Sequence, residues 1–186
     1  MDWTEVLAAP AMTERRLSVL NVRFTHMTKA LVAVLDFLLR RQKRAGLLIS
    51  IDRPHAFISR LLEKHGVPQE RLIYLDTVTN LSGEPAIDSE KLELLASPFC
   101  INFLTSFRDC HSTKAMASGA GFILVDNLSA LSTYMTEECV EKLIAMLGEL
   151  KTECLIVLDK DRHGWLFDAL VKRGASEIDL GDTLCV

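Results

Sequence analysis

The stretch Gly121-Phe-Ile-Leu-Val-Asp-Asn-Leu-Ser129 places an aspartate directly after four consecutive apolar residues. Three other largely apolar runs also end in an aspartate: Leu-Leu-Ile-Ser-Ile-Asp52, Leu-Ile-Tyr-Leu-Asp76 and Leu-Ile-Val-Leu-Asp159. Short runs rich in Leu, Ile and Val are typical of parallel strands that helices cover on both faces. The four runs therefore predict an α/β protein built on a mainly parallel sheet, arranged as a three-layer sandwich.

Around these runs, strand-like and helix-like segments alternate along the chain, as expected of successive βαβ units. Thr136 is predicted to cap the helix that begins at Glu137. Helices are predicted at residues 54–65, 90–96, 98–118, 137–150 and 165–172. Strands are predicted at residues 17–22, 47–51, 72–75, 122–125, 155–158 and 177–180.

The first helix of the pattern begins at Lys29, with Thr28 as its predicted N-cap, and ends in the basic run Arg40-Arg41-Gln42-Lys43-Arg44. Its first ten residues are apolar almost all round, which predicts a central, buried helix. Cations suit the C-terminal end of a helix, so the basic run is interpreted as a solvated helix end. The alternative interpretation is an electrostatic contact with an acidic partner.

The composition indicates a globular chain, because 49% of its 186 residues are hydrophobic and 25% are charged. We expect one domain over residues 1–186, with 1–16 as an N-terminal extension. The net charge of −4 argues against a dedicated nucleic-acid binder. No apolar run approaches the ~20 residues of a membrane-spanning helix. Five widely spaced cysteines and the lack of a recognisable secretory signal favour the cytoplasm.

In a parallel sheet, Asp52, Asp76, Asp126 and Asp159 all emerge at the carboxyl edge, where open α/β sheets bind their ligands. Neighbouring strands lie ~4.8 Å apart, so adjacent carboxylates repel unless something compensates their charge. A divalent cation, a Lys or Arg, or capping amides are three such partners. For any single aspartate, capping the next helix or starting a turn is the more ordinary role.

The segment after the first strand occupies the place of a phosphate-binding P-loop, G-x-x-x-x-G-K-[ST]. It reads Arg23-Phe-Thr-His-Met-Thr-Lys-Ala30, in which Lys29 takes the lysine position. Arg23 and Thr28 replace the two glycines, and Ala30 replaces the hydroxyl that holds Mg²⁺. Glycines are required because successive N–H groups must wrap the phosphates without interference from a Cβ atom. One match in four positions does not make a P-loop.

This order of elements resembles the RecA/KaiC-like branch of P-loop ATPases, particularly its degenerate archaeal-type members. The resemblance rests on the degenerate loop, on Leu47-Leu-Ile-Ser-Ile-Asp-Arg-Pro54 and on the stretch from Gly121 to Ser129, and it spans roughly residues 17–180. It implies that Asp126 takes the place of the aspartate that holds Mg²⁺ through water, followed by Asn127 and Ser129. By position, Asp52 corresponds to the catalytic glutamate of that family, and its side chain is one methylene shorter than that of Glu.

The resemblance also implies which side chains belong to a nucleotide site. The loop Lys160-Asp-Arg-His163 is similar to one that faces a neighbour's nucleotide in active relatives. The predicted catalytic residue is Asp52, and Asp126 is also the predicted Mg²⁺ residue. The predicted nucleotide-binding residues are Thr28, Lys29, Asp126 and Asn127, with Asp76, Asp159, Lys160 and Arg162 as further candidates at the sheet edge.

Three functions are consistent with these residues. The first is a catalytically impaired domain that requires no cofactor and acts as an interaction or regulatory module for a protein partner or a homo-oligomer. The second is a weak ATPase that binds ATP and Mg²⁺ through Lys29 and Asp126. The third is a receiver-like or small-ligand-binding α/β domain, with Lys160 beside the aspartates. Strand order separates the third from the others, because a receiver places its first and third strands together.

Overall fold

The computed structural model describes residues 17–79, 92–94, 104–110 and 119–180. The predicted N-terminal extension, 1–16, lies outside the described residues. The strands are β1 (Leu17–Asn21), β2 (Gly46–Ser50), β3 (Leu72–Asp76), β4 (Leu92–Leu94), β5 (Phe122–Val125), β6 (Glu153–Leu158) and β7 (Ser176–Asp179). The principal α-helices are α3 (Met27–Asp36), α4 (His55–Lys64), α7 (Glu137–Gly148) and α8 (Gly164–Lys172).

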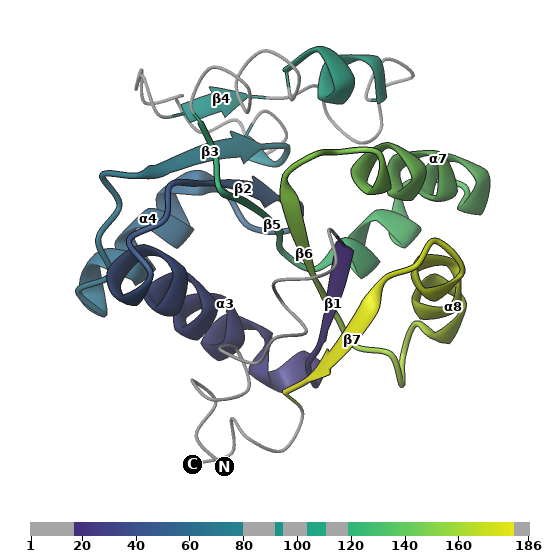
Figure 1. Cartoon of the computed structure of the whole chain (residues 1–186), viewed down its shortest axis with the longest axis horizontal. Coiled ribbons are helices and arrows are strands. Elements are labelled where there is room, and N and C mark those ends of the chain that lie inside the picture. Colours follow the sequence, from purple (N-terminus) through teal and green to yellow (C-terminus); the bar gives the residue numbers. More distant parts are fainter. Residues whose placement is uncertain (1–16, 80–91, 95–103, 111–118, 181–186) are drawn as a thin grey trace.

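The strands form one sheet in the order β4-β3-β2-β5-β6-β1-β7 (Figure 1). Each neighbouring pair is parallel, so the predicted parallel α/β sheet is confirmed. In the centre, Leu47 and Leu48 of β2 lie opposite Ile123 and Leu124 of β5. All strands therefore end at the same edge of the sheet.

Helices cover both faces of the sheet and produce the three predicted layers. On one face α3 and α4 pack against alternate strand residues such as Leu20, Leu48 and Leu124. On the other face α7 and α8 pack against the intervening residues, such as Val19 and Ile123 (Figure 1). The central strands carry apolar residues toward both faces because both faces are buried.

Strand order excludes the receiver-like alternative. The first strand, β1, lies between β6 and β7, and the third strand, β3, lies between β2 and β4. A receiver places its first and third strands together at the centre of the sheet. The two strands are separated here by three others, so the receiver arrangement is wrong for this chain.

The helix predicted at residues 90–96 is wrong, because Leu92–Leu94 form the strand β4. These residues pair with β3, and Leu92 lies opposite Tyr74. Pairing with a neighbouring strand overrides a weak local preference for helix. The periodicity of so few residues does not reveal such pairing. The sheet therefore has a strand more than the six predicted. Of the helix predicted at 98–118, residues 104–110 are helical and the rest lies outside the described residues.

The first helix differs from its prediction in two respects. It begins at Met27, after the 3-10 turn η1 (Phe24–His26), so Thr28 lies inside the helix and is not its cap. It continues into the π-helical turn η2 (Phe37–Arg41). Only one side of α3 is buried, while Val32 and Ala33 on its outer side are partly exposed. The predicted burial thus holds for the side of α3 that packs on the sheet and does not extend to its outer side.

The predictions for the last two helices are confirmed. Helix α7 begins at Glu137, and the Thr136 hydroxyl accepts a hydrogen bond from the Cys139 N–H at 3.4 Å, as an N-cap does. Helix α8 covers the predicted segment with one added residue, Gly164. No helix among the described residues is long and apolar enough to cross a membrane.

Candidate functional site

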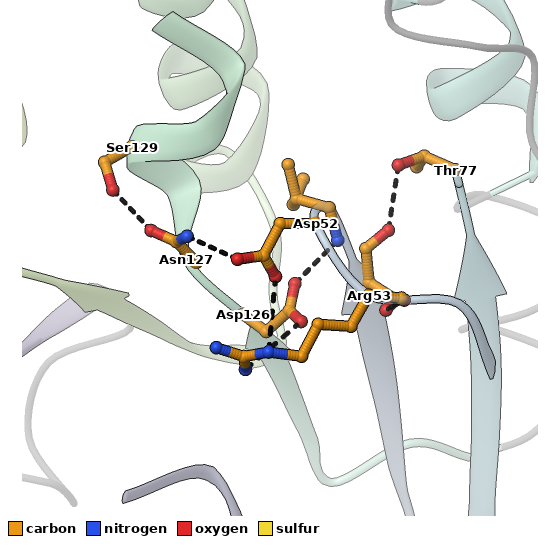
Figure 2. Close-up of polar contacts among 8 residues, drawn as sticks. Asp52, Arg53, Thr77, Asp126, Asn127 and Ser129 are labelled. Atoms are coloured by element: carbon orange, nitrogen blue, oxygen red, sulfur yellow. Dashed lines mark hydrogen bonds and ion pairs between the residues drawn. The ribbon is translucent and has the colours of Figure 1, made fainter. Parts of the chain in front are cut away.

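The carboxyl ends of β2 and β5 bring two of the predicted site residues together, Asp52 and Asp126 (Figure 2). Asp126 directly follows β5 and is 1% exposed. Its backbone N–H donates to Ile49 at 3.0 Å, and its Oδ1 accepts the Ile51 N–H at 2.6 Å. The strand pairing thus holds the Asp126 carboxylate under the turn that carries Asp52.

Asn127 links these two carboxylates to the following turn. Its amide nitrogen donates to Asp52 Oδ2 at 2.6 Å, and its amide oxygen accepts a hydrogen bond from the Ser129 hydroxyl. The Asn127 backbone is left-handed, with φ at 39°, which Asn tolerates better than most residues. This backbone turn directs the amide toward Asp52 and starts the 3-10 helix η3 (Leu128–Thr133).

The two carboxylates leave one oxygen each without a hydrogen bond. Among the described residues, Asp52 Oδ1 and Asp126 Oδ2 are buried and have no hydrogen-bond partner. The Arg53 guanidinium approaches both, with Nε 3.8 Å from Asp52 Oδ1 and Nη1 4.0 Å from Asp126 Oδ2 (Figure 2). Arg53 is therefore the positive charge that compensates the pair.

Burial raises the pKa of Asp126 well above its ordinary value, and the neighbouring Asp52 charge raises it further. The hydrogen bond from Ile51 and the charge of Arg53 act in the opposite direction, and burial outweighs them. The fold therefore favours the neutral, protonated form of Asp126 more than water does.

Mg²⁺ prefers octahedral coordination by oxygen atoms, usually with several waters, one or two carboxylates and substrate phosphates. The two carboxylate oxygens that lack a hydrogen bond have the right chemistry for such an ion, and Arg53 lies against both. The described part of the chain contains no group of three or more His, Cys, Asp or Glu side chains that could hold a metal ion. Asp52 and Asp126 thus fit an ion that arrives with a nucleotide's phosphates, and a resident metal centre has too few ligands here.

Asp76, at the end of β3, is built into the protein as a capping residue. It is fully buried, and its carboxylate accepts the N–H groups of His55 at 2.6 Å, Val78 at 2.7 Å and Thr79 at 2.9 Å. The Thr79 hydroxyl adds a further hydrogen bond. These contacts tie the start of α4 to the turn after β3, which is the ordinary structural role of an aspartate after a strand.

Asp159, after β6, binds the segment that follows β1. Its Oδ2 accepts the Phe24 N–H at 2.8 Å, and its Oδ1 accepts the N–H groups of Asp161 and Arg162 at 3.1 and 3.3 Å. The Arg162 guanidinium lies 4.6 Å from the centre of the Phe24 ring, and its Nε is 3.8 Å from Asp159 Oδ2. Lys160 points elsewhere and pairs with Glu177 at 2.5 Å.

Lys29 and Thr28 line a groove on the outer side of α3, beside the end of α4. Lys29 is exposed and makes no hydrogen bond or ion pair with the rest of the described chain. The structure thus joins Asp52, Asp126 and Asn127, and it places Thr28 and Lys29 in a separate hollow. Arg53 is the member of the site that sequence reasoning missed, and its position directly after Asp52 was the available signal.

No family model and no curated protein matches this sequence. Among solved structures, the chain is similar to a KaiC-like protein from the hyperthermophilic archaeon Pyrococcus horikoshii OT3, with a TM-score of 0.50 and 14% identity. The match covers 78% of this chain and 62% of that protein, so this chain spans less than two thirds of its structural neighbour. At this identity the likeness concerns the fold alone: the chain has the α/β fold of a KaiC-like protein.

Proposed function

We propose that this chain is a KaiC-like domain that does not depend on ATP hydrolysis and acts as an interaction or regulatory module. Its partner is a protein or further copies of the same chain, and it requires no cofactor. The observation that carries the proposal is the hydrogen bond from the Phe24 N–H to the Asp159 carboxylate, at 2.8 Å.

That hydrogen bond matters because of where it lies. Phosphate binding at a strand-to-helix turn depends on free backbone N–H groups that point at the anion. Here the N–H of Phe24, in the segment that replaces the P-loop, is already taken by an internal carboxylate. A phosphate at this point would have to displace Asp159 and would meet its negative charge.

Two further observations support the proposal. Lys29, the residue at the P-loop lysine position, lines the groove between α3 and α4. The carboxylates of Asp52 and Asp126 lie against Arg53, and Asn127 donates to Asp52. Phosphoryl transfer needs a lysine, loop amides and Mg²⁺ directed at the same phosphate. The described contacts direct these groups to different places.

A weak ATPase is the second candidate, and the free oxygens of Asp52 and Asp126 favour it. In that function Asp126 would hold Mg²⁺ through water, Asp52 would orient the attacking water and Lys29 would contact the phosphates. The two candidates differ in whether MgATP binds the folded protein.

Thermal unfolding with MgATP, MgADP, MgGTP and Mg²⁺ alone tests the proposal. A ligand at 100 times its Kd stabilises the folded state by about 2.7 kcal/mol, which for a chain of this size raises Tm by roughly 5–11 °C at about 2–4 °C per kcal/mol. We expect no shift specific to ATP and no release of phosphate. In a ¹⁵N-labelled sample, we expect the Phe24 amide signal to stay in place when MgATP is added.

Lys29→Ala, with Lys172→Ala on α8 as its matched control, completes the experiment. Both lysines are exposed and on helices, and Lys172 lies on the other face of the sheet. A Tm shift specific to ATP that Lys29→Ala removes and Lys172→Ala retains would overturn the proposal and establish the weak ATPase.

A further inference from the structure

Among the described residues, Arg53 is the cation that lies against both Asp52 and Asp126 (Figure 2). It directly follows Asp52 in the turn between β2 and α4. Its backbone carbonyl accepts a hydrogen bond from the hydroxyl of Ser50, the last residue of β2. Ser50 is fully buried, so this contact ties the backbone of Arg53 to the sheet. The guanidinium therefore extends from a fixed point beside the two carboxylates.

The Arg53 side chain is only 17% exposed, although arginine side chains are mostly exposed in folded proteins. Arg162 offers a comparison, because its Nε also lies 3.8 Å from a strand-end carboxylate, that of Asp159. The Arg162 side chain is 58% exposed, and Asp159 accepts three backbone N–H groups as well. Burying a charge costs free energy unless an opposite charge compensates it. The burial of Arg53 is thus explained by two carboxylates that have few other donors.

The Arg53 guanidinium faces the two carboxylate oxygens that lack a hydrogen bond. Its Nε lies 3.8 Å from Asp52 Oδ1 and its Nη1 lies 4.0 Å from Asp126 Oδ2, and both oxygens are buried. These distances exceed the roughly 2.7–3.2 Å of an N–H···O hydrogen bond, so the contacts are ionic. One positive charge thus bridges two carboxylates that follow neighbouring strands, as a bound cation does.

Arg53 and a divalent ion compete for the same two oxygens. Mg²⁺ coordinates oxygen atoms at roughly 2.0–2.1 Å and keeps several waters. Because Asp52 Oδ1 and Asp126 Oδ2 are buried, a hydrated ion reaches both only when a side chain moves aside, and Arg53 lies against both. The positive charge of Arg53 also repels a second cation at this short range.

We propose that Arg53 is a built-in counter-ion, which takes the place of a divalent cation and keeps the Asp52 and Asp126 pair closed to Mg²⁺ and Mn²⁺. This inference rests on the proposed function, because it gives the physical reason why the pair requires no cofactor. Removal of the Arg53 charge should then open a cation site between the two carboxylates.

Arg53→Met tests this role in the full chain, because Met keeps an apolar stem and removes the charge. Mn²⁺ is the probe, since carboxylates and water suit it as they suit Mg²⁺, and its EPR signal decreases when the ion binds. Two carboxylates with waters make a weak site, so Mn²⁺ is titrated into the millimolar range. We expect Arg53→Met to bind Mn²⁺ at least about tenfold more tightly than the wild type, and MnCl₂ to raise the Tm of this variant alone.

Further variants locate the effect. Arg53→Lys keeps the positive charge and should keep the site closed. Arg162→Met, the matched control, removes the exposed guanidinium beside Asp159 and should leave Mn²⁺ binding at the wild-type level. Adding Asp126→Asn to Arg53→Met should return the Kd to the wild-type value, which assigns the ion to this pair. Should Arg53→Met fail to fold, Arg53→Gln replaces it, because Gln keeps hydrogen-bond donors without the charge.

Either of two results would overturn the proposal. In the first, the uncharged variant of Arg53 binds Mn²⁺ no more tightly than the wild type. In the second, the wild type itself binds Mn²⁺ at a site that Asp126→Asn removes, and this measurement needs no change at Arg53. An ATP-specific Tm shift in the wild type overturns the proposed function, whereas either Mn²⁺ result without such a shift overturns the role of Arg53 alone.

Discussion

Asp76 is the last residue of β3, and Asp126 directly follows β5; these two strands flank β2. Each aspartate follows four apolar residues, and both are buried. Their surroundings differ sharply. Asp76 accepts three backbone N–H groups and a hydroxyl, while Asp126 accepts one N–H and lies against a second carboxylate. A buried carboxylate is stabilised by the donors around it. The same sequence pattern therefore yields a capping residue, Asp76, on one side of β2. On the other side it yields a buried pair of carboxylates, Asp126 and Asp52, with few donors.

Asp76→Ala tests the structural half of this comparison and should have the largest effect. It leaves the N–H groups of His55, Val78 and Thr79 without their acceptor. We expect the free energy of unfolding to fall by about 4 kcal/mol, because each buried donor left unpaired costs about 1–3 kcal/mol. Urea unfolding measures this loss. Asp76→Asn, which keeps one acceptor oxygen, is the control and should lose less; a loss below about 1 kcal/mol in Asp76→Ala would remove the cap role.

The pH dependence of stability tests the acidic pair. Because the pKa of Asp126 is raised in the folded state, the folded protein holds a proton that the unfolded chain releases. Its contribution is fully present below the unfolded pKa and is lost as the pH rises through the folded pKa.

Lowering the pH from about 7 toward about 5 should therefore increase the stability of the wild type, by up to about 1.4 kcal/mol per pH unit. The difference between wild type and Asp126→Asn, measured by urea unfolding at each pH, isolates this group from other titrations. If the difference in stability between the two proteins does not change with pH over this range, the pKa of Asp126 is not raised by folding.

Asp126→Asn at neutral pH should stabilise the protein by about 1 kcal/mol. The amide oxygen can still accept the Ile51 N–H, and its nitrogen can donate to Asp52. Asp76→Asn, the same substitution across β2, should destabilise the protein. A higher Tm for Asp126→Asn and a lower Tm for Asp76→Asn would support different roles for the two aspartates. Equal losses in Tm would contradict that difference.

The smallest expected effect concerns the residues that follow the two aspartates. Thr77 donates through its hydroxyl to Ser50 at 2.8 Å, while Asn127 takes a left-handed backbone and donates to Asp52 (Figure 2). Asn127→Gly and Asn127→Ala both lose the amide, but only Ala strains the backbone. We expect Gly to be the more stable by less than about 1 kcal/mol. Thermal unfolding compares the Tm values of the two variants. Equal Tm values would mean that the backbone at residue 127 leaves the left-handed conformation in the Ala variant.

Much of the fold could be predicted because buried parallel strands have a strong local pattern. The apolar runs before Asp52, Asp76, Asp126 and Asp159 became central strands, and these aspartates lie at the ends of parallel strands. The three residues of β4 could not be predicted, because a strand this short exists through its pairing with β3 and carries little pattern of its own.

The sequence predicted which residues belong to the candidate site, but it did not predict which of them contact one another. Asp52, Asp126 and Asn127 come together as a consequence of parallel strand order. The direction of Lys29 depends on which side of α3 packs on the sheet. Ala30, Leu31 and Val34 are buried, and Lys29 lies on the outer side.

The amino-acid sequence by itself determined the central strands, their parallel arrangement and the presence of aspartates at the sheet edge, because burial on both faces imposes a pattern within each segment. Tertiary structure alone decided the roles of these aspartates. Asp76 meets amides, Asp159 holds the Phe24 N–H, and Asp126 meets another carboxylate. These differences arise from residues far apart in the chain, whose proximity depends on strand order and not on any local run of residues.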